Sequence, residues 1–255
     1  MQTPWPYPLW IAHRGAGKLA PENTLAALRL GASHGYRAFE CDVKLSADGA
    51  PFLLHDDTLN RTTSGDGVGS EKSWAELSRL DAGRWHSNAY AGEPLPRLDA
   101  IASYCLHNDF MLNIEIKPTP GDEVQTGRVV AATAAGLWAK HAVKPLLSSF
   151  SPQALHAAMD AAPDLPRALL IDKFFDGLPA AWVDSAQRLR CAAVVTHFSR
   201  MDANAVQQLH GAGMRALVYT VNDAAEAQRL LALGIDGIIT DAVDRFDPQR
   251  RSNAA

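Results

Sequence analysis

Residues 37–56, RAFECDVKLSADGAPFLLHD, contain two apolar runs joined by a short polar link. The link includes Asp48-Gly49, a pair typical of tight hairpin turns. A parallel neighbour would need a connection of about a dozen residues or more, so we expect these runs to form an antiparallel hairpin. The second run then adds no strand to a parallel sheet. Instead, it returns His55 to the edge where the first run ends.

Apolar runs suited to buried parallel strands recur along the chain and alternate with helical segments. Without the second hairpin run there are eight: LWIAHRG (9–15), RAFECDVKL (37–45), MLNIEIKP (111–118), KPLLSSF (144–150), RALLID (167–172), AAVVTHF (192–198), MRALVYTV (214–221) and GIDGIITD (234–241). Eight alternating units in 255 residues predict one α/β domain over residues 1–255, a (β/α)8 TIM barrel. Capping residues predict helices between the strands, over Glu22–His34 and from Ser151, Asp202 and Asn222.

Nearly sixty residues separate His55 from the NIEIK run, too many for a simple connection. They contain Ser73-Trp74-Ala75-Glu76, a capping box that begins a helix, and the loop-like GRWHSNAYAGEPLP (83–96). We expect a lid-like insertion over about residues 57–108, after the second-strand hairpin, that covers the barrel mouth.

Composition excludes several classes of protein. The formal net charge of −4 argues against a nucleic-acid-binding protein, which needs a basic surface. No apolar run approaches the roughly 18 residues of a membrane span, so we expect no membrane insertion. The first residues lack a basic start and a long apolar run, and the three cysteines match no metal or redox spacing. We therefore expect a cytoplasmic protein with reduced cysteines.

Ionisable side chains gather at the C-terminal ends of the predicted strands, where active sites of such barrels lie. Glu40 and Asp42 are two residues apart, as are Glu115 and Lys117, so each pair shares one face of its strand. Three buried carboxylates would be very costly without compensation, and a divalent cation compensates best. Carboxylates without a cysteine suit magnesium or calcium. The alternative is that the three acids only form salt bridges with Arg14 and Lys117.

Two histidines and two basic residues complete this group. His13 and His55 can act as general acid and base near neutral pH. Arg14 offers a planar fork for phosphate oxygens, and Lys117 offers a point charge. We interpret Asp241, which ends the last strand, as structural, and we expect Cys41 to point away from the site.

The ordered motifs HRG, PENT (21–24), ExD, HDDTLNRTT (55–63) and NIEIKP (113–118) resemble the glycerophosphodiester phosphodiesterase family over nearly the whole chain. Further segments, among them WPYP, GEPLP and PLLSSF, resemble its cytoplasmic bacterial branch, which is associated with glycerol-3-phosphate uptake. The resemblance implies a metal-dependent enzyme that hydrolyses glycerophosphocholine, -ethanolamine, -glycerol or -inositol to sn-glycerol 3-phosphate and an alcohol.

The resemblance also implies roles for individual residues. Tyr219-Thr220-Val221-Asn222 stands where many relatives have Trp-x-Val-Asn, so we expect Tyr219 to serve as an aromatic wall for the substrate. Glu40, Asp42 and Glu115 would bind one divalent cation, Mg²⁺ or Ca²⁺. His13 and His55 would act as the acid–base pair, and Arg14 and Lys117 would bind the phosphate.

The predicted reaction begins with attack of the glycerol C2 hydroxyl on phosphorus to give a cyclic phosphate, which water then opens. Direct attack by water is the competing route. Phospholipase D-like action on lysolipids and a catalytically silent phosphate-ligand binder are the alternative functions. A small-molecule substrate is the one partner that the sequence indicates, and it does not indicate the oligomeric state.

Overall fold

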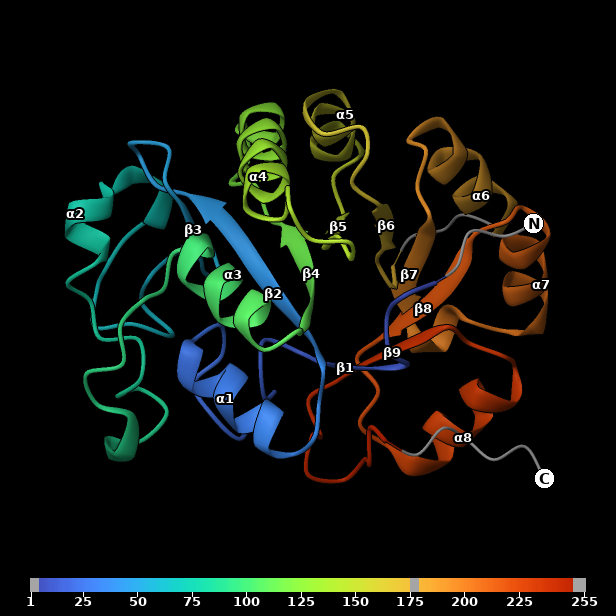
Figure 1. The fold of residues 1–255 in the computed structure, drawn as a ribbon, viewed down its shortest axis with the longest axis horizontal. Coiled ribbons are helices and arrows are strands. Elements are labelled where there is room, and N and C mark those ends of the chain that lie inside the picture. Colours follow the sequence, from blue (N-terminus) through green and yellow to red (C-terminus); the bar gives the residue numbers. More distant parts are fainter. Residues whose placement is uncertain (1–4, 175–178, 250–255) are drawn as a thin grey trace.

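Eight parallel strands form a closed barrel at the centre of the computed structural model, which describes residues 5–174 and 179–249 (Figure 1). The strand order is β1-β9-β8-β7-β6-β5-β4-β2, and pairing of β1 with β2 closes the barrel. The barrel strands are β1 (Trp10–Ala12), β2 (Ala38–Leu45), β4 (Met111–Ile116), β5 (Leu146–Ser149), β6 (Arg167–Ile171), β7 (Ala193–His197), β8 (Arg215–Tyr219) and β9 (Gly237–Thr240). They coincide with the eight apolar runs, and the predicted TIM barrel is confirmed.

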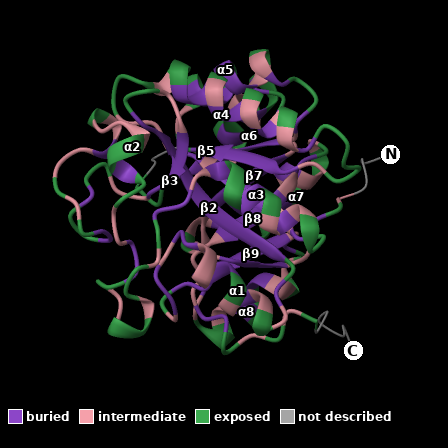
Figure 2. Cartoon of the chain, turned by 60° about the vertical axis from the view of Figure 1, so that its left-hand side comes forward, coloured by how far each residue is buried: buried purple, intermediate pink, exposed green. Residues whose placement is uncertain are grey.

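Helices surround the barrel and cover its apolar outer face. Figure 2 shows the strands as a buried layer beneath helices whose outer faces are exposed. A smaller apolar cluster, which includes Ile11, Leu170 and Leu217, fills the barrel interior. The helices are α1 (Leu25–Ser33), α3 (Leu98–His107), α4 (Glu123–Leu137), α5 (Pro152–Ala161), α6 (Pro179–Arg188), α7 (Ala203–Gly211) and α8 (Ala224–Ala232).

The predicted hairpin is present. Strand β3 (Pro51–Leu53) pairs antiparallel with the end of β2, with Val43 opposite Leu53. Gly49 in the connecting turn has a φ of 78°, which glycine adopts without steric cost. Because β3 pairs only with β2 in the sheet, it lies outside the closed barrel and carries His55 back to its mouth.

Two helices begin later than the sequence predicted. The helix expected over Glu22–His34 begins at Leu25, and the helix expected from Asn222 begins at Ala224. In both cases an asparagine two residues before the helix donates to a carboxylate at the barrel mouth, Asn23 to Asp42 and Asn222 to Asp241. Asn23 has a φ of 59° for this purpose, a left-handed conformation that asparagine tolerates better than most residues.

The segment between β3 and α3 lies to one side of the barrel, on the left in Figure 1. It contains two short 3₁₀ turns, Gly69–Glu71 and Asn88–Tyr90, and the helix α2 (Trp74–Leu77), which begins with the predicted capping box at Ser73. Glu93 of this segment accepts a hydrogen bond from the amide of Ala26 at 2.9 Å, which joins the segment to α1.

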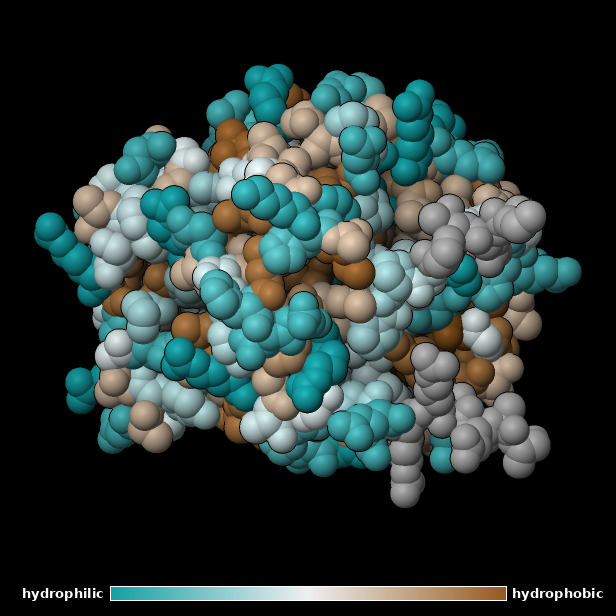
Figure 3. All heavy atoms as spheres, viewed as in Figure 1, coloured by the Kyte–Doolittle hydropathy of each residue, from teal (hydrophilic) through white to brown (hydrophobic). Residues whose placement is uncertain are grey.

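Hydrophilic side chains cover much of the face seen in Figure 3, and hydrophobic side chains gather near its middle. Among the described residues, no helix is long and apolar enough to cross a membrane.

Candidate active site

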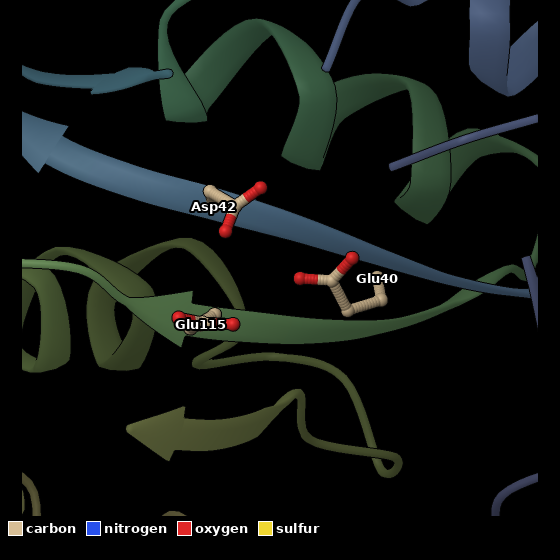
Figure 4. A group of neighbouring side chains, drawn as sticks. All are labelled: Glu40, Asp42 and Glu115. Atoms are coloured by element: carbon tan, nitrogen blue, oxygen red, sulfur yellow. The ribbon is translucent and has the colours of Figure 1, made fainter. Parts of the chain in front are cut away.

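Three carboxylates meet on two neighbouring strands at the barrel mouth. Glu40 and Asp42 lie on β2, and Glu115 lies on β4 directly opposite Asp42 (Figure 4). One oxygen from each lies within 4.8 Å of the other two. The spacing of two residues brings Glu40 and Asp42 to one side of β2, as the sequence predicted, and the register with β4 adds Glu115 on the same side.

The carboxylate charges are not fully compensated by side chains. Burial, together with the charge of Asp42, raises the pKa of Glu40 and of Glu115. Oxygen Oε1 of Glu40 is buried and has no hydrogen-bond partner among the described residues. A hard divalent cation would satisfy this oxygen and relieve the repulsion, so the donor set fits Mg²⁺ or Ca²⁺.

Asp42 differs from its two neighbours because it is held by basic and amide groups. Asn23 donates to it from Nδ2 at 2.8 Å and accepts its backbone N–H at 3.0 Å. Arg14 Nε lies 3.3 Å from Asp42, and Lys117 Nζ lies 3.4 Å away. Although burial would raise the pKa of Asp42, Arg14 and Lys117 hold it well below its ordinary value. The salt bridges of the alternative interpretation thus exist. Among the described residues, however, the one ion-pair partner of Glu40 is His13, 3.8 Å away.

His13, at the end of β1, is oriented by Asp241. Its Nδ1 lies 2.6 Å from Asp241 Oδ1, and Asn222 donates from Nδ2 to the other oxygen of Asp241 at 3.1 Å. Burial alone would lower the pKa of His13, but the hydrogen bond to Asp241 and the charge of Glu40 raise it above its ordinary value. Asp241, interpreted from the sequence as structural, contacts the imidazole directly, so we expect it to position His13 as well.

His55 is paired with the residue next to it. Its Nδ1 lies 2.7 Å from Asp56 Oδ1, and Arg61 binds both oxygens of Asp56 at 2.9 and 2.6 Å. Arg61 also binds both oxygens of Glu22, each at 2.8 Å, and Arg14 donates to the same carboxylate at 2.8 Å. Burial lowers the pKa of His55, and the charge of Asp42 does not offset this effect.

Sequence reasoning did not assign roles to Glu22, Asn23, Asp56 or Arg61. All four lie inside the motifs PENT and HDDTLNRTT, and their position in these motifs is the sequence feature that could have identified them as site residues. Cys41 lies in the apolar layer between strands and helices, away from the site, as predicted.

One cavity of about 160 Å³ joins these groups to aromatic and small side chains. Asp42 lies behind it, held by Arg14 and Lys117. The lining residues are His13, Arg14, Glu40, His55, Asn113, Glu115, Lys117, Ser148, Phe150, Leu170, Tyr219, Thr220 and Ile239.

Known proteins resemble this chain in sequence and in fold. The sequence model of the glycerophosphoryl diester phosphodiesterase family matches residues 13–245. A glycerophosphodiester phosphodiesterase of Caldanaerobacter subterraneus is 31% identical over 237 residues, which are 91% of this chain and 93% of that protein. A phosphodiesterase structure from Oleispira antarctica, in complex with the product sn-glycerol-3-phosphate, has a TM-score of 0.84 and 35% identity, and covers 93% of this chain and 94% of its own.

A second structure, a glycerophosphodiester phosphodiesterase from Agrobacterium tumefaciens, has a TM-score of 0.78 and 28% identity, over 93% of this chain and 98% of that one. The enzyme class predicted from the motifs is confirmed. Enzymes of this family use a divalent cation, which agrees with the acidic cluster. The chain belongs to the glycerophosphoryl diester phosphodiesterase family.

Proposed function

We propose that this enzyme hydrolyses glycerophosphodiesters to sn-glycerol 3-phosphate and an alcohol, with one divalent cation bound by Glu40, Asp42 and Glu115. The observation that carries the proposal is a single cavity lined by both histidines and by Glu40 and Glu115, two members of the three-carboxylate cluster. The glycerol phosphate bound by the Oleispira antarctica enzyme, which has the same fold, supports the substrate class.

One histidine acts as general base and the other as general acid, because their surroundings shift their pKa values in opposite directions. Neutral His55 accepts the proton of the glycerol C2 hydroxyl as its oxygen forms a bond to phosphorus. Protonated His13 donates its proton to the departing alcohol as the bond between phosphorus and that alcohol breaks. Water then opens the resulting cyclic phosphate with the two roles reversed.

Arg14 and Lys117 complete the site by binding phosphate oxygens. When bound, the cation supplies positive charge that favours the ionised hydroxyl and offsets charge on the phosphoryl group. Single-turnover NMR tests the order of events: a transient 1,2-cyclic glycerophosphate supports the two-step route, and its absence supports direct attack by water.

We also propose that residues 1–255 form one domain and that the insertion expected at about 57–108 serves as a side wall of the mouth, with α3 (Leu98–His107) packed on the barrel as an outer helix. The contacts of Arg61 with Glu22 and of Glu93 with Ala26 support this role, because they join the segment to the loop and helix that follow β1. A cytoplasmic location and a link to glycerol-3-phosphate uptake stay predictions from the sequence.

Removal of the cation is expected to stop the reaction. Release of glycerol 3-phosphate from glycerophosphocholine should be lost in EDTA and restored by magnesium or calcium, because the carboxylates alone repel the phosphate. Undiminished release in EDTA would remove the cation from the proposal. Turnover of lysophosphatidylcholine but not glycerophosphocholine would favour the lipid substrate, and turnover of neither would favour the silent binder.

Replacement of Arg61 with methionine is expected to lower kcat by roughly 10- to 100-fold, because Asp56 and Glu22 would no longer hold His55 and Arg14 in place. Arg61→Lys should recover only part of the loss, since lysine cannot bind two carboxylates bidentately. Arg79→Met removes an exposed arginine from the same segment and serves as the control. Equal kcat values for the Arg61→Met and Arg79→Met enzymes would contradict this positioning role.

A further inference from the structure

Asn113 is a polar residue that lines the active-site cavity and has no part in the reaction described above. It lies on β4 two residues before Glu115, so the two side chains face the same side of the strand. In the register of the two strands, Asn113 lies directly opposite Glu40 on β2. Asn113 and Glu40 therefore form the inner pair of a set whose outer pair is Glu115 and Asp42.

The carboxamide of Asn113 is oriented by the next strand of the barrel. Ser148 on β5, which is fully buried, donates from Oγ to Asn113 Oδ1 at 2.9 Å. Because the two branches of a carboxamide diverge, Asn113 Nδ2 points away from Ser148. This bond fixes which end of the amide is left to contact a ligand.

The amide nitrogen itself lacks an acceptor. Asn113 is 4% exposed, and its Nδ2 has no hydrogen-bond partner among the described residues. A buried N–H without an acceptor costs free energy, and native proteins leave few such groups. Glu40 Oε1, on the residue directly opposite, is also buried and lacks a partner in the described part of the chain. An unused donor and an unused acceptor thus belong to facing residues of one cavity, which is the arrangement that binds a hydroxyl group.

The lining of the cavity changes from charged to neutral with depth. Lys117, Glu115 and Asn113 line it in this order from the mouth inward, and each step of two residues spans about 6.6 Å along an extended chain. Leu170 and Ile239 line the same cavity and belong to the apolar cluster of the barrel interior. The inner end therefore offers one amide donor beside apolar surface.

The glycerol half of the substrate has one group that matches this inner end. In the proposed reaction, Arg14 and Lys117 bind the phosphate on C3, and the C2 hydroxyl attacks phosphorus. The C1 hydroxymethyl group is left, and it combines one apolar carbon with a hydroxyl that can accept from an amide. An anionic group would not suit the position, because Glu40 and Glu115 would repel it.

We propose that Asn113 is a specificity-determining residue whose Nδ2 donates a hydrogen bond to the C1 hydroxyl of the glycerol half. Ser148 is a positioning residue that holds the amide in the required orientation. The inference rests on the proposed function, because the phosphate and the C2 hydroxyl must be bound at the outer end of the cavity. A diester without the C1 hydroxyl keeps its nucleophile but leaves the buried amide of Asn113 without an acceptor.

The test compares glycerophosphocholine with its 1-deoxy analogue, in which a hydrogen atom replaces the C1 hydroxyl. Both compounds keep the C2 hydroxyl and release choline, so one choline assay measures kcat/KM for both. We expect the wild-type enzyme to prefer glycerophosphocholine by on the order of 10- to 100-fold, because the analogue leaves a buried donor unpaired. Asn113→Ala should remove most of this preference, by lowering kcat/KM for glycerophosphocholine more than for the analogue.

Two further variants complete the comparison. Ser148→Ala should reduce the preference by a smaller factor, because the amide is kept but is no longer oriented. Asn204→Ala, at an exposed asparagine on α7, is the matched control and should keep the wild-type ratio. Circular dichroism shows which variants fold.

Equal kcat/KM values of the wild-type enzyme for the two substrates would overturn the role of Asn113 and leave the proposed function standing. An undiminished preference in a folded Asn113→Ala enzyme would do the same. If Asn113→Ala does not fold, an undiminished preference in Ser148→Ala would overturn the inference instead. Turnover of neither substrate by the wild-type enzyme would overturn the proposed function and the inference together.

Discussion

The Glu40→Gln enzyme is expected to lose turnover by on the order of 10³-fold or more. Its metal-free form should nevertheless unfold at a higher temperature than the metal-free wild-type enzyme. Glutamine removes a ligand charge that the cation requires. In the metal-free protein it also removes a buried negative charge close to Asp42 and Glu115. Loss of function and gain of stability in one variant would distinguish a cation ligand from a structural salt-bridge partner.

The stability gain should depend on pH. Because folding raises the pKa of Glu40, its ionised form disfavours the folded state, and this penalty grows as the pH rises through the folded-state pKa. The Tm difference between Glu40→Gln and wild type in EDTA should therefore be larger at pH 8 than at pH 5.5.

Circular dichroism melts measure this difference, and Glu71→Gln, at an exposed glutamate, is the control. A lower Tm for Glu40→Gln than for wild type at pH 8 would contradict the assignment.

Asp241→Asn is expected to lower kcat by on the order of 10²- to 10⁴-fold, the range of a general acid or base. Asparagine keeps the shape of the side chain but cannot hold an imidazolium by charge. Because Asp241 raises the pKa of His13, its removal lowers that pKa. Protonated His13 then persists only to a lower pH, so the basic limb of the kcat/KM profile should move to lower pH.

A full pH–rate profile of both enzymes tests this prediction. Asp160→Asn is the control, because Asp160 lies near His156 on the surface, 3.8 Å away, and has no contact with the site. A basic limb that stays in place in the Asp241→Asn enzyme would show that another group supplies the proton. The purely structural role first assigned to Asp241 would then be restored.

Local sequence patterns predicted the barrel well, because the residue types in each strand and turn depend on the burial and backbone conformation of that segment. Buried parallel strands are apolar throughout, so all eight appear as runs in the sequence. The Asp48-Gly49 turn and the short link identify the hairpin, because no parallel crossover fits there. The helix starts at Leu25 and Ala224 were missed, because long-range partners occupy the residues before them.

The sequence by itself determined the fold and the alignment of Glu40 with Asp42, since a spacing of two places side chains on one face of a strand. The register of β2 against β4 then places Glu115 opposite Asp42. Only the tertiary structure decided which groups control the two histidines. Asp241 is 228 residues from His13, and the two meet because β9 pairs with β1 when the barrel closes. Such contacts depend on which strands become neighbours, and no local spacing encodes them.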